Sequence, residues 1–364
     1  MYAHAASPRL DHRQAQYLPF IALFSKKLSA ILKKRIHNPL NIIFYTLLKE
    51  TDMTWIALAT YAGPQGNAPA LVLDQQLYDL CALHQAGLEP VPLAYREGGV
   101  EAIVKDGKNG QRWLEAVAAQ AQALVQERKV GPVAEGSRKL QAPYVPQHMF
   151  CAASNYAKHA NEMGTVLAAK SESKPYMFLK LSNTVIGPGG TVLMPPETTK
   201  LDWEIELAAV IGKRCRRVGV QEALDCVAYY TILNDVTARD LNLRSDYPFK
   251  HDWFQGKCHD TFAPFGPWLV PASQIPDPQS VHMRLDVNGE SMQDDSAATM
   301  IWTVREQIAY LSTIVTLEPG DVIATGTPTG VGMGRGVFLK DGDRMLASIN
   351  GIGELANQVR AQAV

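Results

Sequence analysis

The sequence predicts an α+β fold that is rich in β-strands, a mixed roll or sandwich with few peripheral helices. Strand-like apolar runs separated by turns fill the chain after residue 145. Helical patterns are scarce there, and strands do not alternate regularly with helices. A doubly wound parallel sheet is therefore disfavoured.

The expected elements follow in chain order. A strand at 55–61 and a second apolar run at 68–73, separated by a turn, open the body of the protein. A helix is expected over 113–128, because apolar residues recur there with the spacing of one helix face, and Gly131-Pro132 ends it. The later strands are expected at 149–153, 176–180, 204–211, 229–234, 266–270, 283–287, 322–325 and 344–349, with helices at 222–226 and 304–312.

Composition divides the chain into three segments. Residues 1–52 carry eight Lys or Arg and three acidic residues, whereas the rest of the 364-residue chain is net acidic. We expect this basic segment to be an extension outside the folded core, with Met53 as the real start; a presequence of the mitochondrial type is the alternative. Residues 53–144 are expected to form a small N-terminal α/β domain and linker, and residues 145–364 the catalytic domain.

Charge and cysteine content exclude several classes of protein. The formal net charge of −1 provides no field for binding nucleic acid. Five cysteines without a C-x-x-C pair argue against a disulfide framework or a zinc ribbon and favour a reducing compartment. The apolar runs of the basic segment are shorter than the roughly 18 residues that span a bilayer. We expect a cytoplasmic protein with a small-molecule partner.

Three carboxylates indicate a metal site. Glu204 and Glu206 lie in an apolar strand, where alternate side chains share a face, and two buried anions repel each other unless a cation lies between them. Asp235 follows the next apolar strand and could lie alongside. Oxygen ligands favour Mg²⁺, then Mn²⁺ or Ca²⁺. The alternative is a metal-free cluster in which both glutamates pair with Arg239 and Lys257.

A second group of residues has the spacing of a general base. His159 and Glu162 are three residues apart, so on a helical turn the carboxylate can orient the imidazole. An incidental pair on an exposed helix is the alternative. The polar segment 161–174 resembles a mobile lid that could close over a substrate.

A Gly- and Thr-rich loop follows the strand at 322–325. Its backbone N–H groups and hydroxyls could bind an anionic oxygen, although a plain turn is the alternative. The loop has neither a Walker sequence nor a G-x-G-x-x-G order, so ATP and NAD are not supported.

These motifs, in this order, resemble the fumarylacetoacetate hydrolase superfamily over about residues 145–358. The resemblance implies the family's mixed β-roll, a homodimer, and Mg²⁺ or Mn²⁺ bound by Glu204, Glu206 and Asp235. It also implies that His159 and Glu162 activate a water molecule. The matching segments are Asn155-Tyr156 with His159, Phe178-Leu179-Lys180, Ile186-Gly187-Pro188, Glu204-Ile205-Glu206, Asn234-Asp235 with Ala238-Arg239-Asp240, Gly256-Lys257, Asp260-Thr261-Phe262, Gly266-Pro267, Val287-Asn288-Gly289 and Thr325-Gly326-Thr327-Pro328.

The resemblance assigns further roles. Lys257 would be catalytic, and substrate contacts would come from Tyr156, Arg239, Asn242 and Thr327. Fumarylacetoacetases proper carry an additional metal-binding Asp before the catalytic His, where this chain has Cys151-Ala152-Ala153-Ser154. With three ligands, the chain is similar to the branch of acylpyruvases, oxaloacetate decarboxylases, hydratases and isomerases.

The expected function is metal-dependent hydrolysis of a carbon–carbon bond in a 2,4-dioxo acid of the acylpyruvate or fumarylpyruvate type. A water activated by His159 and Glu162 would attack the distal carbonyl, and the metal would stabilise an enolate product. The alternative is a hydratase, isomerase or decarboxylase of a related 2-oxo diacid, such as 2-hydroxyhepta-2,4-diene-1,7-dioate, in the catabolism of aromatic compounds. A minor alternative is a protein that binds oxo acids without catalysis.

Overall fold

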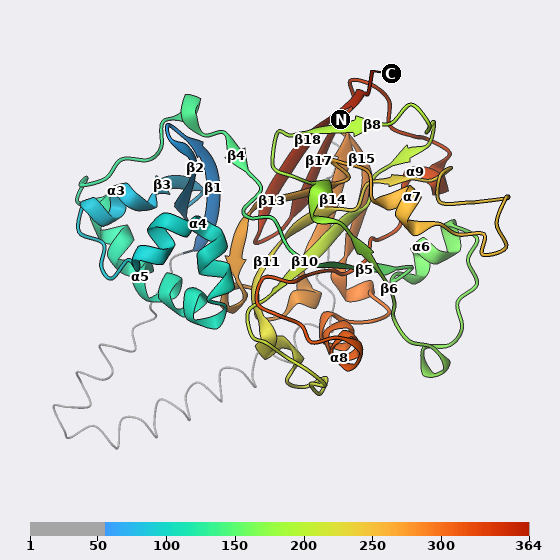
Figure 1. The fold of residues 1–364 in the computed structure, drawn as a ribbon, viewed down its shortest axis with the longest axis horizontal. Coiled ribbons are helices and arrows are strands. Elements are labelled where there is room, and N and C mark those ends of the chain that lie inside the picture. Colours follow the sequence, from blue (N-terminus) through green and yellow to red (C-terminus); the bar gives the residue numbers. More distant parts are fainter. Residues whose placement is uncertain (1–54, 364) are drawn as a thin grey trace, which may run out of the picture. The chain divides into compact units, whose positions relative to one another are not determined.

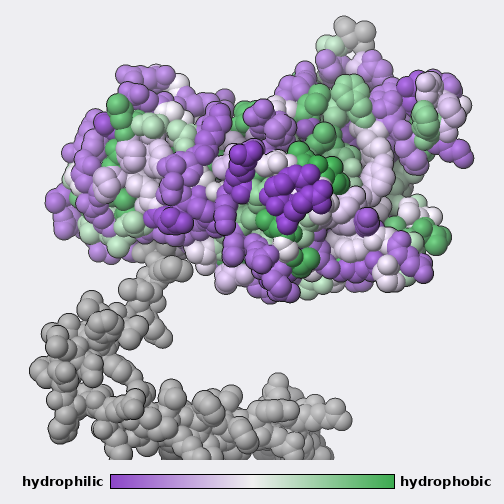
Figure 2. Space-filling model, turned by 60° about the horizontal axis from the view of Figure 1, so that its bottom comes forward, coloured by the Kyte–Doolittle hydropathy of each residue, from purple (hydrophilic) through white to green (hydrophobic). Residues whose placement is uncertain are grey.

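The computed structural model describes residues 55–363. The expected basic extension, residues 1–52, lies outside the described residues. Within 55–363, no helix is long and apolar enough to cross a membrane. Hydrophilic residues cover most of the face shown in Figure 2, and hydrophobic residues gather there in separate clusters.

An eleven-stranded mixed sheet forms the centre of the fold (Figure 1). Its order is β3-β2-β1-β13-β11-β10-β16-β5-β6, with β4 also paired to β1 and β7 to β13. The strands β10 and β11 are buried at every position, as expected where a sheet is covered on both faces. The strands are β1 (Ile56–Gly63), β2 (Gly66–Leu73), β3 (Gln76–Asp79), β4 (Leu140–Gln141), β5 (Met149–Ala153), β6 (Tyr176–Lys180), β7 (Val185–Ile186), β10 (Ile205–Ile211), β11 (Val227–Asn234), β13 (Ala263–Pro271) and β16 (Val322–Ala324).

A second, five-stranded sheet contacts the first through β10, β11 and β13. Along β14 and β17, buried and exposed residues alternate, so one face of this sheet packs inward and the other faces solvent. A separate pair is formed by β9 (Leu201–Asp202) and β12 (Thr237–Ala238). The strands of the second sheet, in spatial order, are β15 (Glu290–Ser296), β14 (His282–Val287), β17 (Arg344–Ile349), β18 (Gly353–Ala361) and β8 (Thr191–Met194).

Helices are few and lie at the periphery of the sheets (Figure 1), so the predicted β-rich α+β fold is confirmed. The helix expected over 113–128 begins earlier, at Lys108, directly after Gly107 with its positive φ of 62°. The short helix expected at 222–226 is a 3-10 helix, Ala223–Cys226. The α-helices are α3 (Leu80–Gln85), α4 (Leu93–Lys105, kinked at Gly99), α5 (Lys108–Gln126), α6 (Ala157–Glu162), α7 (Trp253–Lys257), α8 (Val304–Ile314) and α9 (Gly332–Arg335). The other 3-10 helices are Glu135–Ser137, Lys170–Glu172, Ser182–Thr184, Ala272–Gln274, Pro278–Ser280 and Ala297–Thr299.

The N-terminal strands continue the sheet that carries the later motifs. Leu58 in β1 lies opposite Leu269 in β13. Leu58 and Leu114 also share one hydrophobic cluster with Leu233 and Phe265. The proposed boundary between residues 144 and 145 stays a prediction, and any such domains would share this sheet.

Asn155, which is 1% exposed, connects the end of β5 to two other segments. Its Nδ2 donates to Thr325 O at 2.7 Å and Trp302 O at 2.9 Å, and its Oδ1 accepts from Trp302 N at 2.8 Å. We expect Asn155→Ala to lower the free energy of unfolding by about 2–4 kcal/mol, because Trp302 N loses its partner and the two carbonyls keep only their bonds from Gln307. Chemical denaturation measures this. The exposed Asn109→Ala is the control, and an equally small effect of both substitutions would contradict the expectation.

Candidate active site

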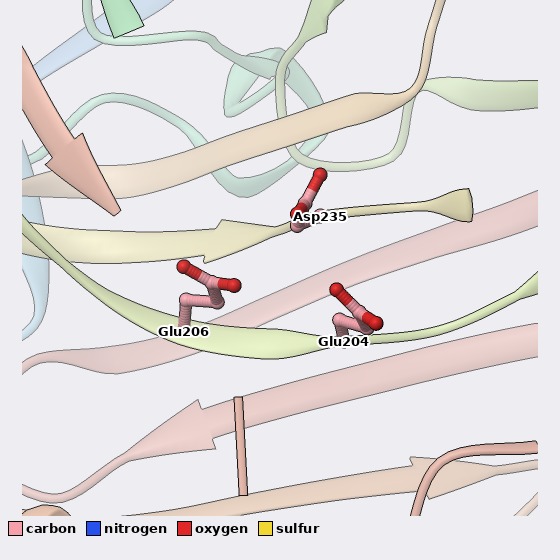
Figure 3. Close-up of side chains that lie close together, drawn as sticks. All are labelled: Glu204, Glu206 and Asp235. Atoms are coloured by element: carbon pink, nitrogen blue, oxygen red, sulfur yellow. The ribbon is translucent and has the colours of Figure 1, made fainter. Parts of the chain in front are cut away.

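The three predicted carboxylates meet at one end of the β10–β11 pair (Figure 3). Glu204 directly precedes β10, Glu206 lies within it, and Asp235 directly follows β11. Antiparallel pairing places Ile205 opposite Asn234, so Asp235 lies beside the two glutamates. One oxygen from each carboxylate lies within 4.8 Å of the others, and all three residues are buried. Among the described residues, they are the one group of acids, His or Cys with this geometry.

Two buried basic residues bind part of this cluster. Lys257 Nζ donates to Glu204 Oε2 at 2.6 Å and to Asp235 Oδ2 at 2.5 Å. Arg239 donates from Nε to Asp202 at 2.7 Å and from Nη2 to Glu204 at 2.5 Å. Burial alone would raise the pKa of Glu204, but Arg239 and Lys257 outweigh it and hold that pKa well below its usual value. Glu204 is therefore ionised.

Glu206 has no such partner. It accepts a hydrogen bond from Gly326 N at 2.8 Å, and among the described residues no Lys or Arg forms an ion pair with it. Burial, followed by the charges of Asp235 and Glu204, raises the pKa of Glu206 well above its usual value. In the metal-free alternative, both glutamates pair with Arg239 and Lys257. Glu204 does form these ion pairs, but within residues 55–363 Glu206 does not.

The cluster as a whole fits a divalent cation. Both oxygens of Asp235 already face a basic partner, Oδ1 the Nζ of Lys180 at 2.7 Å and Oδ2 the Nζ of Lys257. Glu206, a buried carboxylate without a basic partner in the described part of the chain and beside two other carboxylates, is what a hard cation with oxygen ligands would satisfy. Around the cluster, the four buried acids Asp202, Glu204, Glu206 and Asp235 outnumber by one the three buried bases Lys180, Arg239 and Lys257.

The predicted His–Glu pair is formed on α6. His159 is 5% exposed, and its Nδ1 lies 2.8 Å from Glu162 Oε1. Glu162 Oε2 also accepts from Thr329 Oγ1 at 2.7 Å and from Gly330 N at 2.9 Å. Burial alone would raise the pKa of Glu162, but the bonds from His159, Gly330 and Thr329 outweigh it and lower that pKa. An ionised Glu162 can only accept, so Nδ1 carries the imidazole proton and Nε2 is the basic nitrogen.

A cavity of about 680 Å³ connects the two groups. His159, Glu204, Arg239 and Lys257 line it, as do Asn242 and Thr327 from the predicted substrate contacts. The Oδ1 atom of Asn242 is buried without a hydrogen bond, whereas Thr327 Oγ1 already donates to Ile205 O at 2.8 Å. Tyr156 does not line the cavity; it is 1% exposed, and its buried hydroxyl has no partner among the described residues.

Several residues of the site were given no role by the sequence patterns, although Phe178 and Lys180 lie in one of the segments that match the family. Thr329, which holds Glu162, lies in the Gly/Thr-rich loop, but nothing in that loop indicates its partner. Lys180 reaches Asp235 from β6, which two strands, β16 and β5, separate from β10. An aromatic wall of Tyr176, Phe178 and Trp253 also lines the cavity, and these residues meet only in the folded chain.

The comparison with protein-family models decides the assignment. Residues 148–360 match the model described as fumarylacetoacetate (FAA) hydrolase C-terminal, which is more than half of the chain. The chain belongs to the fumarylacetoacetate hydrolase family. A Burkholderia cenocepacia member that is named only as a hydrolase is 43% identical over 209 residues, covering 57% of this chain and 71% of that protein.

Solved structures of family members include enzymes with different reactions. The fumarylacetoacetate hydrolase of Exiguobacterium antarcticum is 33% identical, with a TM-score of 0.67 over 84% of this chain and 100% of that one. The fumarylpyruvate hydrolase of Pseudomonas aeruginosa, solved with Mn²⁺ and pyruvate, is 35% identical, with a TM-score of 0.55 over 63% and 95%. The 2-hydroxyhepta-2,4-diene-1,7-dioate isomerase of Mycobacterium marinum is 28% identical, with a TM-score of 0.61 over 85% and 100%.

Proposed function

We propose that this chain is a divalent-metal-dependent hydrolase that cleaves a carbon–carbon bond in a 2,4-dioxo acid. The observation that carries the proposal is the placement of His159, oriented by an ionised Glu162, in the same cavity as Glu204 and Lys257. A base held beside a carboxylate cluster that would bind a divalent cation is suited to adding water to a carbonyl that the cation polarises. The hydrolase from P. aeruginosa, solved with Mn²⁺ and pyruvate, supports the same reaction class.

Glu204, Glu206 and Asp235 would hold the ion, Mg²⁺ or Mn²⁺ first and Ca²⁺ as the alternative. When bound, the ion supplies positive charge that binds and polarises the oxygen atoms of the oxo acid. Asn242 and Thr327 would bind the substrate from the cavity wall, and Arg239 would do so while it holds Glu204. Tyr156 would require a change of side-chain position to reach a ligand.

The reaction then follows from the positions of the side chains. Nε2 of His159 takes a proton from water, and the resulting hydroxide adds to carbon 4 of the dioxo acid. The bond between carbons 3 and 4 breaks, and its electron pair passes to carbon 3 as the enolate of pyruvate. His159 returns the proton to carbon 3, which releases pyruvate and a carboxylic acid. The Lys257 ammonium, kept charged by Asp235 and Glu204, stabilises the developing negative charge.

An isomerase, hydratase or decarboxylase remains the second candidate, because the similar M. marinum structure is an isomerase. A substrate panel distinguishes the candidates: acetylpyruvate, fumarylpyruvate, oxaloacetate and 2-hydroxyhepta-2,4-diene-1,7-dioate, each with Mg²⁺ or Mn²⁺. We expect pyruvate release from the first two and none of the other reactions at a comparable rate. Isomerisation or decarboxylation without cleavage of either dioxo acid would contradict the proposal.

Substitutions at Thr329 test how Glu162 and His159, the proposed catalytic dyad, are oriented. We expect Thr329→Val to lower kcat by about 10-fold, because Glu162 loses one of its hydrogen bonds. Losing this bond also raises the pKa of Glu162, so activity should fall at a higher pH than in the wild type as the solution is acidified. The control is Thr329→Ser, which keeps the hydroxyl and should restore both kcat and the pH profile. Equal losses in the two variants would indicate a packing role only.

We further propose that the enzyme is a cytoplasmic homodimer, possessing a catalytic domain at 145–364. Support for a reducing compartment comes from the cysteines, all five of which are free thiols. Mass measurement in solution tests the dimer, and a monomer at micromolar concentration would contradict it.

A further inference from the structure

A ladder of aromatic rings leads away from the charged cluster along the cavity. Lys257 Nζ lies 5.2 Å from the ring centre of Phe178. Phe178 stacks on Trp253 at 4.9 Å with an interplanar angle of 23°. Tyr176 and His251 continue the ladder at 5.9 Å and 6.3 Å from Trp253. All four rings line the cavity, so a ligand anchored near Lys257 would extend along aromatic faces.

Apolar residues from two other segments also line the cavity. Met163, Leu167 and Ala168 contribute from the segment after α6, and Ile301 and Trp302 from the loop before α8. The cavity volume of about 680 Å³ falls within the roughly 300–1,000 Å³ of pockets that enclose drug-sized ligands. Acetylpyruvate is far smaller than such ligands, so an acetyl group would leave most of this apolar surface in contact with water.

Charge argues against an acidic acyl group. Arg239 and Lys257 are already paired with buried carboxylates. His159 is bound to Glu162, and the other basic residues of the lining, Lys174 and His251, are exposed. Ion pairs with exposed groups contribute little because water screens them. A second carboxylate on the substrate would therefore lose hydration in an apolar channel without a buried partner.

We propose that the acyl group of the substrate is aromatic and uncharged, and that it binds against Tyr176, Phe178 and Trp253. The inference rests on the proposed function, because it assumes that the oxo-acid end binds at the carboxylate cluster. Stacking and apolar burial favour a planar ring in this position. Tyr176, 58% exposed at the outer end of the ladder, is the residue that the acyl group would cover.

Binding tests the inference without any turnover. Calorimetry on the full chain with Mn²⁺ compares 2-oxo-4-phenylbutanoate, 2-oxobutanoate and 2-oxoadipate, which lack the 4-oxo group that cleavage requires. We expect the phenyl compound to bind at least about 10-fold more tightly than 2-oxobutanoate, because it buries an apolar ring. Equal affinities for these two, or tightest binding of the diacid, would overturn the inference.

Tyr176→Ala should lower the affinity for 2-oxo-4-phenylbutanoate by about 3- to 10-fold and leave the affinity for 2-oxobutanoate unchanged. This side chain is largely exposed, so the substitution should not unfold the protein. Tyr247→Ala is the matched control: Tyr247 is 54% exposed and does not line the cavity. If both variants retain the preference for the phenyl compound, the acyl group does not bind against the aromatic ladder as proposed.

Turnover separates this inference from the proposed function. We expect kcat/KM for benzoylpyruvate to exceed that for acetylpyruvate by at least about 10-fold in the wild type and by less in Tyr176→Ala. Phenyl-selective binding without cleavage of either compound would overturn the proposed function and leave the inference intact. Cleavage of both compounds at equal kcat/KM would overturn the inference alone.

Discussion

Glu206→Gln should weaken Mn²⁺ binding by at least about 100-fold while leaving the protein folded. The substitution keeps the shape of the side chain and removes the charge that is not balanced by a nearby base. Gly326 N, which donates to Glu206 Oε2 at 2.8 Å, can equally donate to the amide oxygen of Gln. Isothermal titration with Mn²⁺ measures the loss.

The thermal stability of the same variant gives an independent readout. Burial and the charges of Asp235 and Glu204 raise the pKa of Glu206, so its ionised form is unfavourable in the metal-free protein. Without metal, Glu206→Gln should therefore melt at the same temperature as the wild type or higher. Saturating Mn²⁺ should raise the melting temperature of the wild type only. The exposed Glu101→Gln is the control, and Mn²⁺ affinity like that of the wild type in Glu206→Gln would contradict the metal site.

His159→Ala should reduce kcat for a 2,4-dioxo acid by about 1,000-fold, within the range that general-base catalysis contributes. The side chain forms no part of the carboxylate cluster, so Mn²⁺ affinity should remain within about 3-fold of the wild-type value, well below the loss expected for a lost ligand. Stopped turnover with intact metal binding is the signature of a base rather than of a ligand.

Glu162 should act only through His159. Glu162 Oε1 lies 2.8 Å from His159 Nδ1 and keeps the imidazole proton on that nitrogen, so Glu162→Gln should also lower kcat strongly. The double variant should have a kcat no lower than that of His159→Ala. The exposed His282→Ala is the control for removing a histidine. Additive losses in the double variant would show that the two residues act separately, contrary to the proposed dyad.

Patterns of neighbouring residues predicted most of the fold. The apolar runs at 149–153 and 176–180 form β5 and β6 with those bounds. The strand β18 was missed, because Glu354, Asn357, Gln358 and Arg360 hide its alternating buried residues among polar ones. The helix α4 was missed as well, since Gly98 and Gly99 disfavour a helix and Gly99 indeed kinks it.

The site was predictable where strand geometry decides it. Alternation along β10 and pairing with β11 were sufficient to bring Asp235 to the two glutamates. The contacts from Lys180 to Asp235 and from Thr329 to Glu162 join residues 55 and 167 positions apart, and no local pattern encodes such distances. Those contacts follow from the strand order β10-β16-β5-β6, which the sequence does not display.

The most direct test of the central claim is hydrolysis in ¹⁸O-labelled water. The purified full chain with Mn²⁺ is given benzoylpyruvate or acetylpyruvate, and the products are analysed by mass spectrometry. The proposed mechanism predicts equimolar pyruvate and carboxylic acid, with one ¹⁸O atom in the released acid from the water that His159 activates. Absence of cleavage, or a released acid without the label, would contradict it.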